Sequence, residues 1–368
     1  MRFFCEKYLL QAACAVASRA TASKSPIPAL EGLQLIAEDK LRVQGYDLKK
    51  AIVTSIDADI AERGSLVVGA RLFGEMIRRL PDGIVSIESD AKDNLSVKCG
   101  KSSFNILGIS SADYPELPSF DAVNSVTLPQ KILKDMINRT LFAVSSDEVR
   151  PIYTGTLFEI HGKELTLVSV DGYRLARRVE TLEEAEMEDC SFVVPGGALS
   201  DVEKICSDEE GKVSIAVGAK HISFSVGDTV VISRRLEGEF LNYRKSIPDS
   251  FKVMLKVDRG ELISCIDRVS LIVSEKNTSP VRMTLGDGVI DCLCVTPIGR
   301  AEDVCTCEGS GEGLLIGFND RYMKDALKAA STDELLLCVN TASSPCIIKA
   351  ADGSEGFTYM VLPVRLHA

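Results

Sequence analysis

Histidine is scarce in this sequence, and the motifs that usually mark an active site are missing. The three histidines, His161, His221 and His367, do not lie in a spacing typical of a metal site or a catalytic triad. The chain also lacks G-x-S-x-G and H-E-x-x-H motifs, and its many acidic residues are dispersed instead of paired for acid–base chemistry. The sequence therefore does not support an enzyme, and we expect no cofactor.

Long hydrophobic runs are also absent, since no apolar stretch approaches the roughly 20 residues that cross a membrane. The first residues faintly resemble a secretory signal, because Leu9–Ala17 is mostly apolar. The charged Glu6 and Lys7, however, lie where the apolar region of such a signal should begin, and the polar Gln11 interrupts that region. We predict instead a strand followed by an amphipathic helix, and no membrane partner.

The twelve cysteines are spread through 368 residues, mostly at apolar positions, which is typical of buried, reduced thiols in a cytosolic protein. Cys292-x-Cys294 and Cys305-x-Cys307 have one intervening residue each, whereas zinc knuckles usually have two to four. Residues two apart share one face of a strand. We therefore predict that the two cysteines of each pair pack on the same face of a strand, and we expect no bound metal. A zinc site is the alternative.

A glycine-rich stretch occurs at Gly309–Gly313. A phosphate-binding loop would be followed by Lys-Ser or Lys-Thr and a helix, but here a predicted strand follows. The stretch is therefore predicted to be a flexible connector.

The strongest positive feature is a block that occurs three times: an apolar strand, a short amphipathic helix, then two alternating strands. The copies cover residues 66–97, 192–224 and 314–348, and their lead position moves from Val67 to Val193 to Leu315, by 126 and 122 residues. A period of this length indicates a repeated domain with its own core, because solenoid units are much shorter. Repeated domains on one chain favour a symmetric object, such as a ring or an array.

The repeat predicts three domains: residues 1–124, 125–250 and 251–368. Linkers rich in proline and acidic residues, Asp113–Pro118 and Tyr243–Asp249, lie near the two boundaries. Strands separated by turn residues, such as Asp171-Gly172 and Pro297–Gly299, predict antiparallel hairpins. The expected class is α+β, with antiparallel sheets and helices gathered on one side.

Basic residues are concentrated in the predicted helices. The whole chain has a net charge of −11, yet six helical segments contain 14 basic and 10 acidic residues, so the remaining residues carry a net charge of −15. The segments are Glu6–Arg19, Arg71–Arg79, Pro129–Arg139, Gly197–Cys206, Asp258–Arg268 and Asp320–Lys328. For one helix this is an ordinary solvated face, but the net positive charge of the six segments taken together indicates a basic surface on an acidic protein.

Three motifs then resemble one family over the whole chain, the bacterial sliding clamps, which are the β subunits of DNA polymerase III. They are Val170–Ala176 (VDGYRLA), Gly238–Lys245 (GEFLNYRK) and Ile316–Asn319 with Tyr322, and the terminal Tyr359–Leu366 completes the set. The resemblance implies three similar domains and a head-to-tail homodimeric ring of six domains. It further implies that two helices per domain line a central channel for double-stranded DNA, bound without regard to sequence.

The resemblance also implies a processivity factor that tethers the replicative polymerase, the clamp loader and other proteins with a clamp-binding motif, located in the cytoplasm at the nucleoid. The expected DNA-channel residues are Lys7, Lys24, Arg71, Arg78, Arg79, Lys131, Lys134, Arg139, Lys204, Arg268, Arg321, Lys324 and Lys328. The expected dimer interface comprises Phe104 and Ile106 of the first domain and Ile272 and Val273 of the third.

The family's partner-peptide pocket is expected between the second and third domains. Its residues here are Tyr153, Val170, Gly172, Tyr173, Arg174, Leu175, Leu241, Lys245, Ser246, Asn319, Tyr322, Ser344, Met360, Val361, Leu362, Pro363, Val364, Arg365 and Leu366. Tyr173, Leu241, Lys245 and Thr278 depart from common family residues, and His367-Ala368 extend past the usual end. We therefore expect a partner motif that differs in detail.

Three alternatives remain at this stage. One is the clamp type built from two-domain chains as a trimer, which three repeats in one chain disfavour. The second is a cysteine-dependent or metal enzyme. The third is a multi-domain structural or protein-interaction scaffold that does not encircle DNA.

Overall fold

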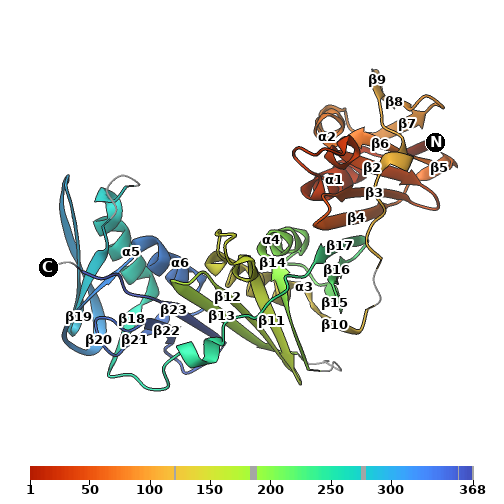
Figure 1. The fold of residues 1–368 in the computed structure, drawn as a ribbon. Coiled ribbons are helices and arrows are strands. Elements are labelled where there is room, and N and C mark those ends of the chain that lie inside the picture. The colour runs from red at the N-terminus through yellow and green to blue at the C-terminus, as the bar shows by residue number, and fades with distance from the viewer. Residues whose placement is uncertain (120–121, 183–188, 275–278, 355, 367–368) are drawn as a thin grey trace. The chain divides into compact units, whose positions relative to one another are not determined.

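The computed structural model describes residues 1–119, 122–182, 189–274, 279–354 and 356–366 (Figure 1). In this part of the chain no helix is both long and apolar enough to cross a membrane. The described residues form two compact units, and the first of several points at which the chain passes from one unit to the other falls within the helix at residues 130–138. One unit contains a five-stranded and an eight-stranded sheet, and the other contains a ten-stranded sheet.

Six α-helices lie in the described residues, two in each third of the chain, as the sequence predicts. They are α1 (Lys7–Ala17), α2 (Ala70–Arg79), α3 (Gln130–Asn138), α4 (Gly196–Ile205), α5 (Arg259–Val269) and α6 (Asp320–Ala329). The Asp258 carboxylate accepts a hydrogen bond from the Glu261 backbone N–H at 2.7 Å and so caps the start of α5. Asn319 caps α6 in the same way through the Tyr322 backbone N–H, at 3.1 Å.

All sheets are antiparallel ladders. The five-stranded sheet has the order β5 (Asp59–Glu62), β1 (Arg2–Glu6), β7 (Ile84–Ser89), β8 (Asn94–Cys99) and β9 (Ser102–Leu107). The eight-stranded sheet has the order β10 (Asn124–Pro129), β15 (Lys212–Val217), β16 (His221–Val226), β17 (Thr229–Arg234), β4 (Lys50–Ile56), β3 (Leu41–Tyr46), β2 (Gly32–Ala37) and β6 (Gly64–Gly69). The strand and helix predicted at the start of the chain are thus confirmed as β1 and α1.

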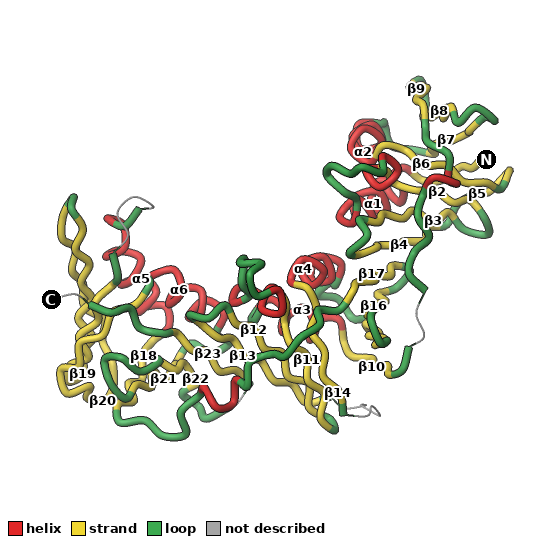
Figure 2. The backbone as a smooth tube through the Cα atoms, in the orientation of Figure 1, coloured by secondary structure: helices red, strands yellow, loops and turns green. Residues whose placement is uncertain are grey.

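The ten-stranded sheet joins the second and third parts of the chain. Its order is β14 (Cys190–Pro195), β11 (Gly155–His161), β12 (Glu164–Val170), β13 (Arg174–Thr181), β23 (Phe357–Val361), β22 (Cys346–Ala350), β21 (Glu334–Val339), β18 (Val253–Asp258), β20 (Gly299–Phe318) and β19 (Val281–Thr296). Figure 2 shows α5 and α6 side by side on one face of this sheet. The predicted α+β class is confirmed.

The threefold repeat is present in the structure. The successive elements are β6-α2-β7-β8 in the first copy, β14-α4-β15-β16 in the second and β20-α6-β21-β22 in the third. Each copy places one helix directly after its apolar strand. Two sheets nevertheless run across the thirds, because β4 pairs with β17 and β13 pairs with β23.

The prediction of a flexible connector at residues 309–313 is wrong, because β20 runs straight through them. The glycines instead permit close contact with β19: a Cβ atom on Gly311 would lie 2.3 Å from Cβ of Leu285. The register between the two strands shifts on both sides of Asp287. Glycine is therefore required here by strand packing and by bulges.

The cysteine pairs pack as the same-face interpretation predicts. Cys292, Cys294 and Cys305 are all buried in the core beneath α5, which contributes Cys265. Of the twelve cysteines, ten are buried, and Cys190 and Cys307 are half-buried. Among the described residues no group of three or more His, Cys, Asp or Glu side chains has the geometry to hold a metal ion.

Candidate functional site

A pocket of about 290 Å³ lies in the unit that contains the ten-stranded sheet. It is formed by two stretches far apart in the sequence, one around the β12–β13 hairpin and one at the end of the chain. The lining residues are Arg150, Tyr153, Val170, Gly172, Arg174, Leu241, Ser246, Pro345, Met360 and Leu362. The volume and the mixture of aliphatic, aromatic and cationic side chains suit a few side chains of a short peptide.

The Asp171-Gly172 turn shapes one wall of the pocket. Gly172 has φ of +93°, a conformation that strongly favours glycine. Asp171 is not in this region, and its carboxylate accepts hydrogen bonds from the backbone N–H groups of Tyr173 and Arg174, at 2.8 and 2.9 Å. The predicted hairpin is confirmed, but only one of its turn residues has a positive φ, and the side chain of the other holds the turn together.

Arg174 is the most constrained cation in the pocket. Its Nε donates to Asp171 at 2.9 Å and its Nη1 donates to Asp325 of α6 at 2.7 Å. The guanidinium also lies 4.4 Å from the ring centroid of Tyr322 and 5.3 Å from that of Phe142. Two carboxylates and two rings therefore fix the position of this buried arginine.

A second polar cluster holds the loop that supplies Leu241 and Ser246. The hydroxyl of the buried Tyr243 donates a hydrogen bond to the carboxylate of Glu159 at 2.6 Å. Arg244 donates to both oxygens of the same carboxylate, at 3.1 and 2.9 Å. Burial and the bond to Glu159 raise the pKa of the Tyr243 hydroxyl, so it remains a donor at physiological pH.

The end of the chain forms the opposite wall. After β23 the Leu362 N–H donates to the carbonyl of Tyr173 at 2.8 Å, and the Val364 N–H donates to that of Gly317, also at 2.8 Å. Leu366 packs so closely on Gly317 that a Cβ atom there would lie 2.6 Å from Leu366 Cδ2. The terminal segment is thus attached to the sheet by backbone pairing on both sides.

The structure brings eight of the predicted pocket residues together in this lining. They are Tyr153, Val170, Gly172, Arg174, Leu241, Ser246, Met360 and Leu362. The other predicted residues lie around this set: Leu175 and Val361 are buried; Tyr173, Lys245, Asn319, Val364 and Arg365 are exposed; and Tyr322, Ser344, Pro363 and Leu366 are half-buried.

Two lining residues, Arg150 and Pro345, do not appear among the residues predicted from the sequence. Arg150 is exposed in the loop before a short 3₁₀ helix at Pro151–Thr154, and Pro345 directly follows the predicted Ser344. Their proximity in sequence to Tyr153 and Ser344 is the signal that could have identified them. Thr278, His367 and Ala368 lie outside the described residues.

The predicted DNA-channel residues differ in how far they are already engaged by acidic side chains. Those with an ion pair are Lys7 (with Asp82), Arg78 and Arg79 (with Glu75), Lys134 (with Asp208), Arg139 (with Asp135), Arg268 (with Asp303), Arg321 (with Asp325) and Lys324 (with Asp267 and Asp320). Within the described ranges, no ion pair involves Lys24, Arg71, Lys131, Lys204 or Lys328, and all five are exposed.

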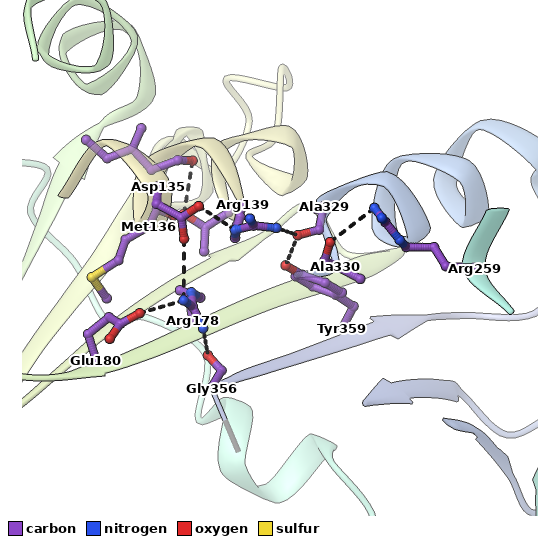
Figure 3. A network of polar contacts seen from close by, with 12 residues as sticks. Asp135, Met136, Arg139, Arg178, Glu180, Arg259, Ala329, Ala330, Gly356 and Tyr359 are labelled. Atoms are coloured by element: carbon purple, nitrogen blue, oxygen red, sulfur yellow. Dashed lines mark hydrogen bonds and ion pairs between the residues drawn. The ribbon is translucent and has the colours of Figure 1, made fainter. Parts of the chain in front are cut away.

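Arg139 is engaged both by a carboxylate and by a backbone carbonyl. Its Nε donates to Asp135 and its Nη1 donates to the carbonyl of Ala329, both at 2.6 Å (Figure 3). The hydroxyl of Tyr359 donates to the same carbonyl at 2.9 Å. The guanidinium of Arg139 is therefore used within the protein and has little capacity left for a phosphate.

A larger groove, of about 780 Å³, lies in the first third of the chain between α1, α2 and the edge strand β9. It is lined by Phe104 and Ile106 of β9 and by Leu72 of α2, a residue that is 60% exposed. Arg71, Arg78 and Arg79 also border this groove. The structure thus brings together two sets that the sequence assigned separately, the dimer residues and three of the channel arginines.

The third-domain residues of the predicted dimer interface follow α5. Ile272 and Val273 are half-buried against the core, whereas the neighbouring Leu271 is 82% exposed. Sequence reasoning did not single out Leu271, although an apolar residue directly beside Ile272 was the available signal. In this unit β19 is one of the two edge strands of the ten-stranded sheet.

Comparison with known proteins covers nearly the whole chain. Models of the N-terminal, central and C-terminal domains of the DNA polymerase III beta subunit match residues 1–118, 127–242 and 244–365. A beta sliding clamp of Staphylococcus aureus is 32% identical over 360 residues, which cover 95% of both chains.

Solved structures show the same fold. The DNA polymerase sliding clamp of Bacillus subtilis has a TM-score of 0.95 at 29% identity over the whole of both chains. A putative DNA polymerase III beta subunit of Eubacterium rectale has a TM-score of 0.94 at 31% identity over 99% of each chain. The chain therefore belongs to the family of DNA polymerase III beta subunits and is a three-domain DNA sliding clamp.

Proposed function

We propose that two copies of this chain close head to tail into a ring around double-stranded DNA and act as a processivity factor without catalysis of their own. The single observation that supports this most is the contrast in charge, since exposed basic residues lie on the helices of an acidic chain. Arg71, Lys131, Lys204 and Lys328 are exposed and make no ion pair among the described residues. The six domains of the ring would be two copies of residues 1–124, 125–250 and 251–368.

The DNA interaction we propose is electrostatic and independent of sequence. Unpaired lysine and arginine side chains attract phosphates, and phosphate contacts carry no sequence information. A weak field from many sites changes little along the duplex, so the ring can slide. Arg139 is a weak member of the proposed lining, because Asp135 and the Ala329 carbonyl already engage it.

The ring joint we propose is formed by the groove of the first domain and the surface around Ile272 of the third. Phe104, Ile106 and the exposed Leu72 offer an apolar surface, and a closed ring would cover the edge strands β9 and β19. Because two different surfaces meet, the contact is heterologous, and two such contacts close a dimer. Arg71, Arg78 and Arg79 would contribute to this joint as well as to the channel.

The pocket would bind short peptides of the replicative polymerase, the clamp loader and other proteins with a clamp-binding motif. Val170, Met360 and Leu362 supply apolar contacts, and Arg150 adds a cation at the rim. Deletion of residues 362–368 should abolish binding of a polymerase tail peptide and leave the ring intact. The place of action would be the cytoplasm, on the DNA of the nucleoid.

The ring is tested by sedimentation of the intact chain and of the double variant Ile272→Asp/Val273→Asp. We expect a dimer for the unchanged chain and a monomer for the variant, with circular dichroism unchanged. A monomeric unchanged chain, or a variant that stays dimeric, would contradict the proposed joint. The exposed Val149→Asp, in the loop before the peptide pocket, provides a surface control that should remain dimeric.

A further inference from the structure

Three buried thiols converge beneath α5, and the functions described above use none of them. Cys265 lies on α5, Cys292 on β19 and Cys305 on β20, and each is no more than 1% exposed. The thiols of Cys265 and Cys292 are hydrogen-bonded to each other, and Cys305 lies close enough to act on both electrostatically. Because no metal site is formed by the described residues, the chemistry open to this cluster is that of thiols.

The position of Cys265 is fixed by its neighbours on the same face of α5. Glu261 and Arg268, four residues before it and three after it, both reach across to β20. The Glu261 carboxylate accepts hydrogen bonds from the N–H and the hydroxyl of Thr306, at 2.9 and 2.8 Å, and Arg268 forms an ion pair with Asp303. The helix is therefore attached to the β19–β20 hairpin on both sides of Cys265, which holds its thiol against the strands.

The pair lies close to solvent although it is buried. Cys292 is directly opposite Asp303 in the β19–β20 ladder, and the side chains of Asp303 and Arg268 are both partly exposed. In addition, β19 is an edge strand, so it is held by a ladder on one side only. Local opening of such a strand requires less free energy than global unfolding. A small oxidant can therefore reach the two thiols without unfolding the domain.

The two thiols differ in acidity. The hydrogen bond from the Cys292 thiol lowers the pKa of Cys265, and the nearby Arg268 acts in the same direction, against the effects of burial and of Asp303. The same hydrogen bond, together with burial, raises the pKa of Cys292. Because the thiolate is the reactive form of cysteine, Cys265 is the group that attacks and Cys292 the group that resolves.

We propose that Cys265 and Cys292 form a reversible redox site, which a peroxide oxidises to a disulfide that fastens α5 to the edge strand β19. The site goes beyond the proposed function, since it depends on neither the ring nor DNA.

The reaction has two steps. The Cys265 thiolate attacks one oxygen of the peroxide and the O–O bond breaks, which leaves a sulfenic acid on Cys265 and a hydroxide that takes up the proton lost by the thiol. The sulfur of Cys292 then attacks the sulfur of Cys265, and the hydroxyl leaves as water with the Cys292 proton. In total two thiols lose two protons and two electrons, and hydrogen peroxide is reduced to two waters. A dithiol reverses the change by thiol–disulfide exchange.

The test treats the folded full chain with hydrogen peroxide, blocks the remaining thiols with N-ethylmaleimide and maps disulfides by mass spectrometry without reduction. We expect one dominant product, the Cys265–Cys292 bond, which dithiothreitol removes. Cys265→Ala or Cys292→Ala should lower the disulfide yield at least about tenfold. Cys294→Ala is the matched control and should keep the yield, because Cys294 is equally buried on the same strand but its thiol lies near Asp320 and Arg282.

Hydrogen exchange provides a second readout. Amides of β19 in the oxidised chain should exchange at least about 3-fold more slowly than in the reduced chain, because the disulfide restricts local opening of the strand. Cys294→Ala should keep this difference, and Cys265→Ala should lose it.

Three results of the mapping would overturn the site. They are a sulfinic acid on Cys265 without a disulfide, a bond from Cys265 to Cys305 in place of Cys292, and a Cys265–Cys292 bond that forms only after the chain has been unfolded in urea. Unchanged exchange in β19 after complete formation of the bond would overturn the proposed effect on the edge strand.

Discussion

Two sheets of this protein cross from one third of the chain to the next, and the two joints are built differently. Each joint consists of five residue pairs, between β4 and β17 in one unit and between β13 and β23 in the other. At the β4–β17 joint one buried carboxylate, Asp201 of α4, receives two cations, Lys50 and Arg19. The hydroxyls of Thr54 and Thr229 also share a hydrogen bond across this joint, at 2.8 Å, but both of these ion pairs meet at the single buried carboxylate of Asp201.

At the β13–β23 joint the polar contacts are distributed over three arginines. Arg139 donates to the carbonyl of Ala329, Arg178 donates to that of Gly356 at 2.9 Å, and Arg174 donates to Asp325 (Figure 3 shows the first two). The same joint carries the peptide pocket. The comparison teaches that the joint with the binding site is held by contacts from several arginines, one of which is also part of the pocket wall.

The largest effect is expected at the β4–β17 joint. Lys50→Met leaves the Asp201 carboxylate buried with only Arg19, 3.9 Å away, to compensate its charge. We expect a loss of about 3 kcal/mol in the free energy of unfolding, measured with urea. Lys49→Met, at an exposed neighbouring position, should change it by less than about 0.5 kcal/mol. A Lys50→Met variant as stable as this control would show that the joint does not depend on Asp201.

The double variant Lys50→Met/Asp201→Leu sharpens this result. It removes the buried charge along with its partner, so stability should recover to within about 1 kcal/mol of the unchanged chain. If the double variant is less stable than Lys50→Met alone, packing around α4, and not charge compensation, dominates the joint.

A smaller effect is expected at the β13–β23 joint. Arg178→Gln removes hydrogen bonds to Gly356, Glu180 and Asp135 and should cost about 2 kcal/mol, seen as faster hydrogen exchange of β23 amides. Arg177→Gln is the control, because Arg177 pairs through its backbone in the same ladder, whereas its side chain makes no hydrogen bond or ion pair within the described residues. Unchanged exchange in β23 would contradict the role of Arg178.

Arg139 and Arg178 should not behave independently, because both contact Asp135. In a double-mutant cycle with Arg139→Gln and Arg178→Gln we expect a coupling of about 0.5–1 kcal/mol. Strict additivity would mean that Asp135 does not link the two arginines.

At the pocket, Arg174→Lys keeps the charge but cannot bridge Asp171 and Asp325 with a planar fork. We expect peptide affinity to fall about tenfold, as measured by fluorescence anisotropy. The free energy of unfolding should change by less than the free energy of peptide binding. Arg300→Lys at the exposed tip of the β19–β20 hairpin should leave affinity unchanged. Equal affinities of the two variants would show that the geometry of Arg174 does not matter to the pocket.

The smallest effect is expected on the surface of α2. Glu75→Gln breaks the ion pairs with Arg78 and Arg79. Because all three side chains are exposed, we expect no measurable change in the free energy of unfolding. The hydrogen bond from Arg78 lowers the pKa of Glu75, so any stability from these pairs is present at neutral pH and disappears as pH falls through that pKa. A clear destabilisation at neutral pH would show that surface pairs matter here as much as the buried joints.

The sequence predicted the repeated elements well, because each rests on local periodicity and turn residues. The Asp171-Gly172 hairpin and the six helices are examples. It failed at residues 309–313, because the need for glycine there comes from close contact with β19, which lies about 25 residues away in the sequence. Composition alone could not distinguish a flexible linker from a bulged strand.

For the site, family motifs indicated eight of the lining residues, but spacing could not show which basic side chains were already engaged. Arg139 occupies a helix position that predicts exposure to DNA, and only the three-dimensional structure shows its contact with Ala329. The convergence of Phe104 and Arg71 on one groove is likewise a result of tertiary packing.

The central claim, that a closed ring holds DNA by encirclement, is tested most directly by loading the chain onto a nicked circular plasmid with a clamp loader and separating bound from free protein by gel filtration at high salt. We predict that the protein stays with the circle and is lost within minutes after a single restriction cut. Equal retention on circular and linear DNA, or loss from both, would contradict the account.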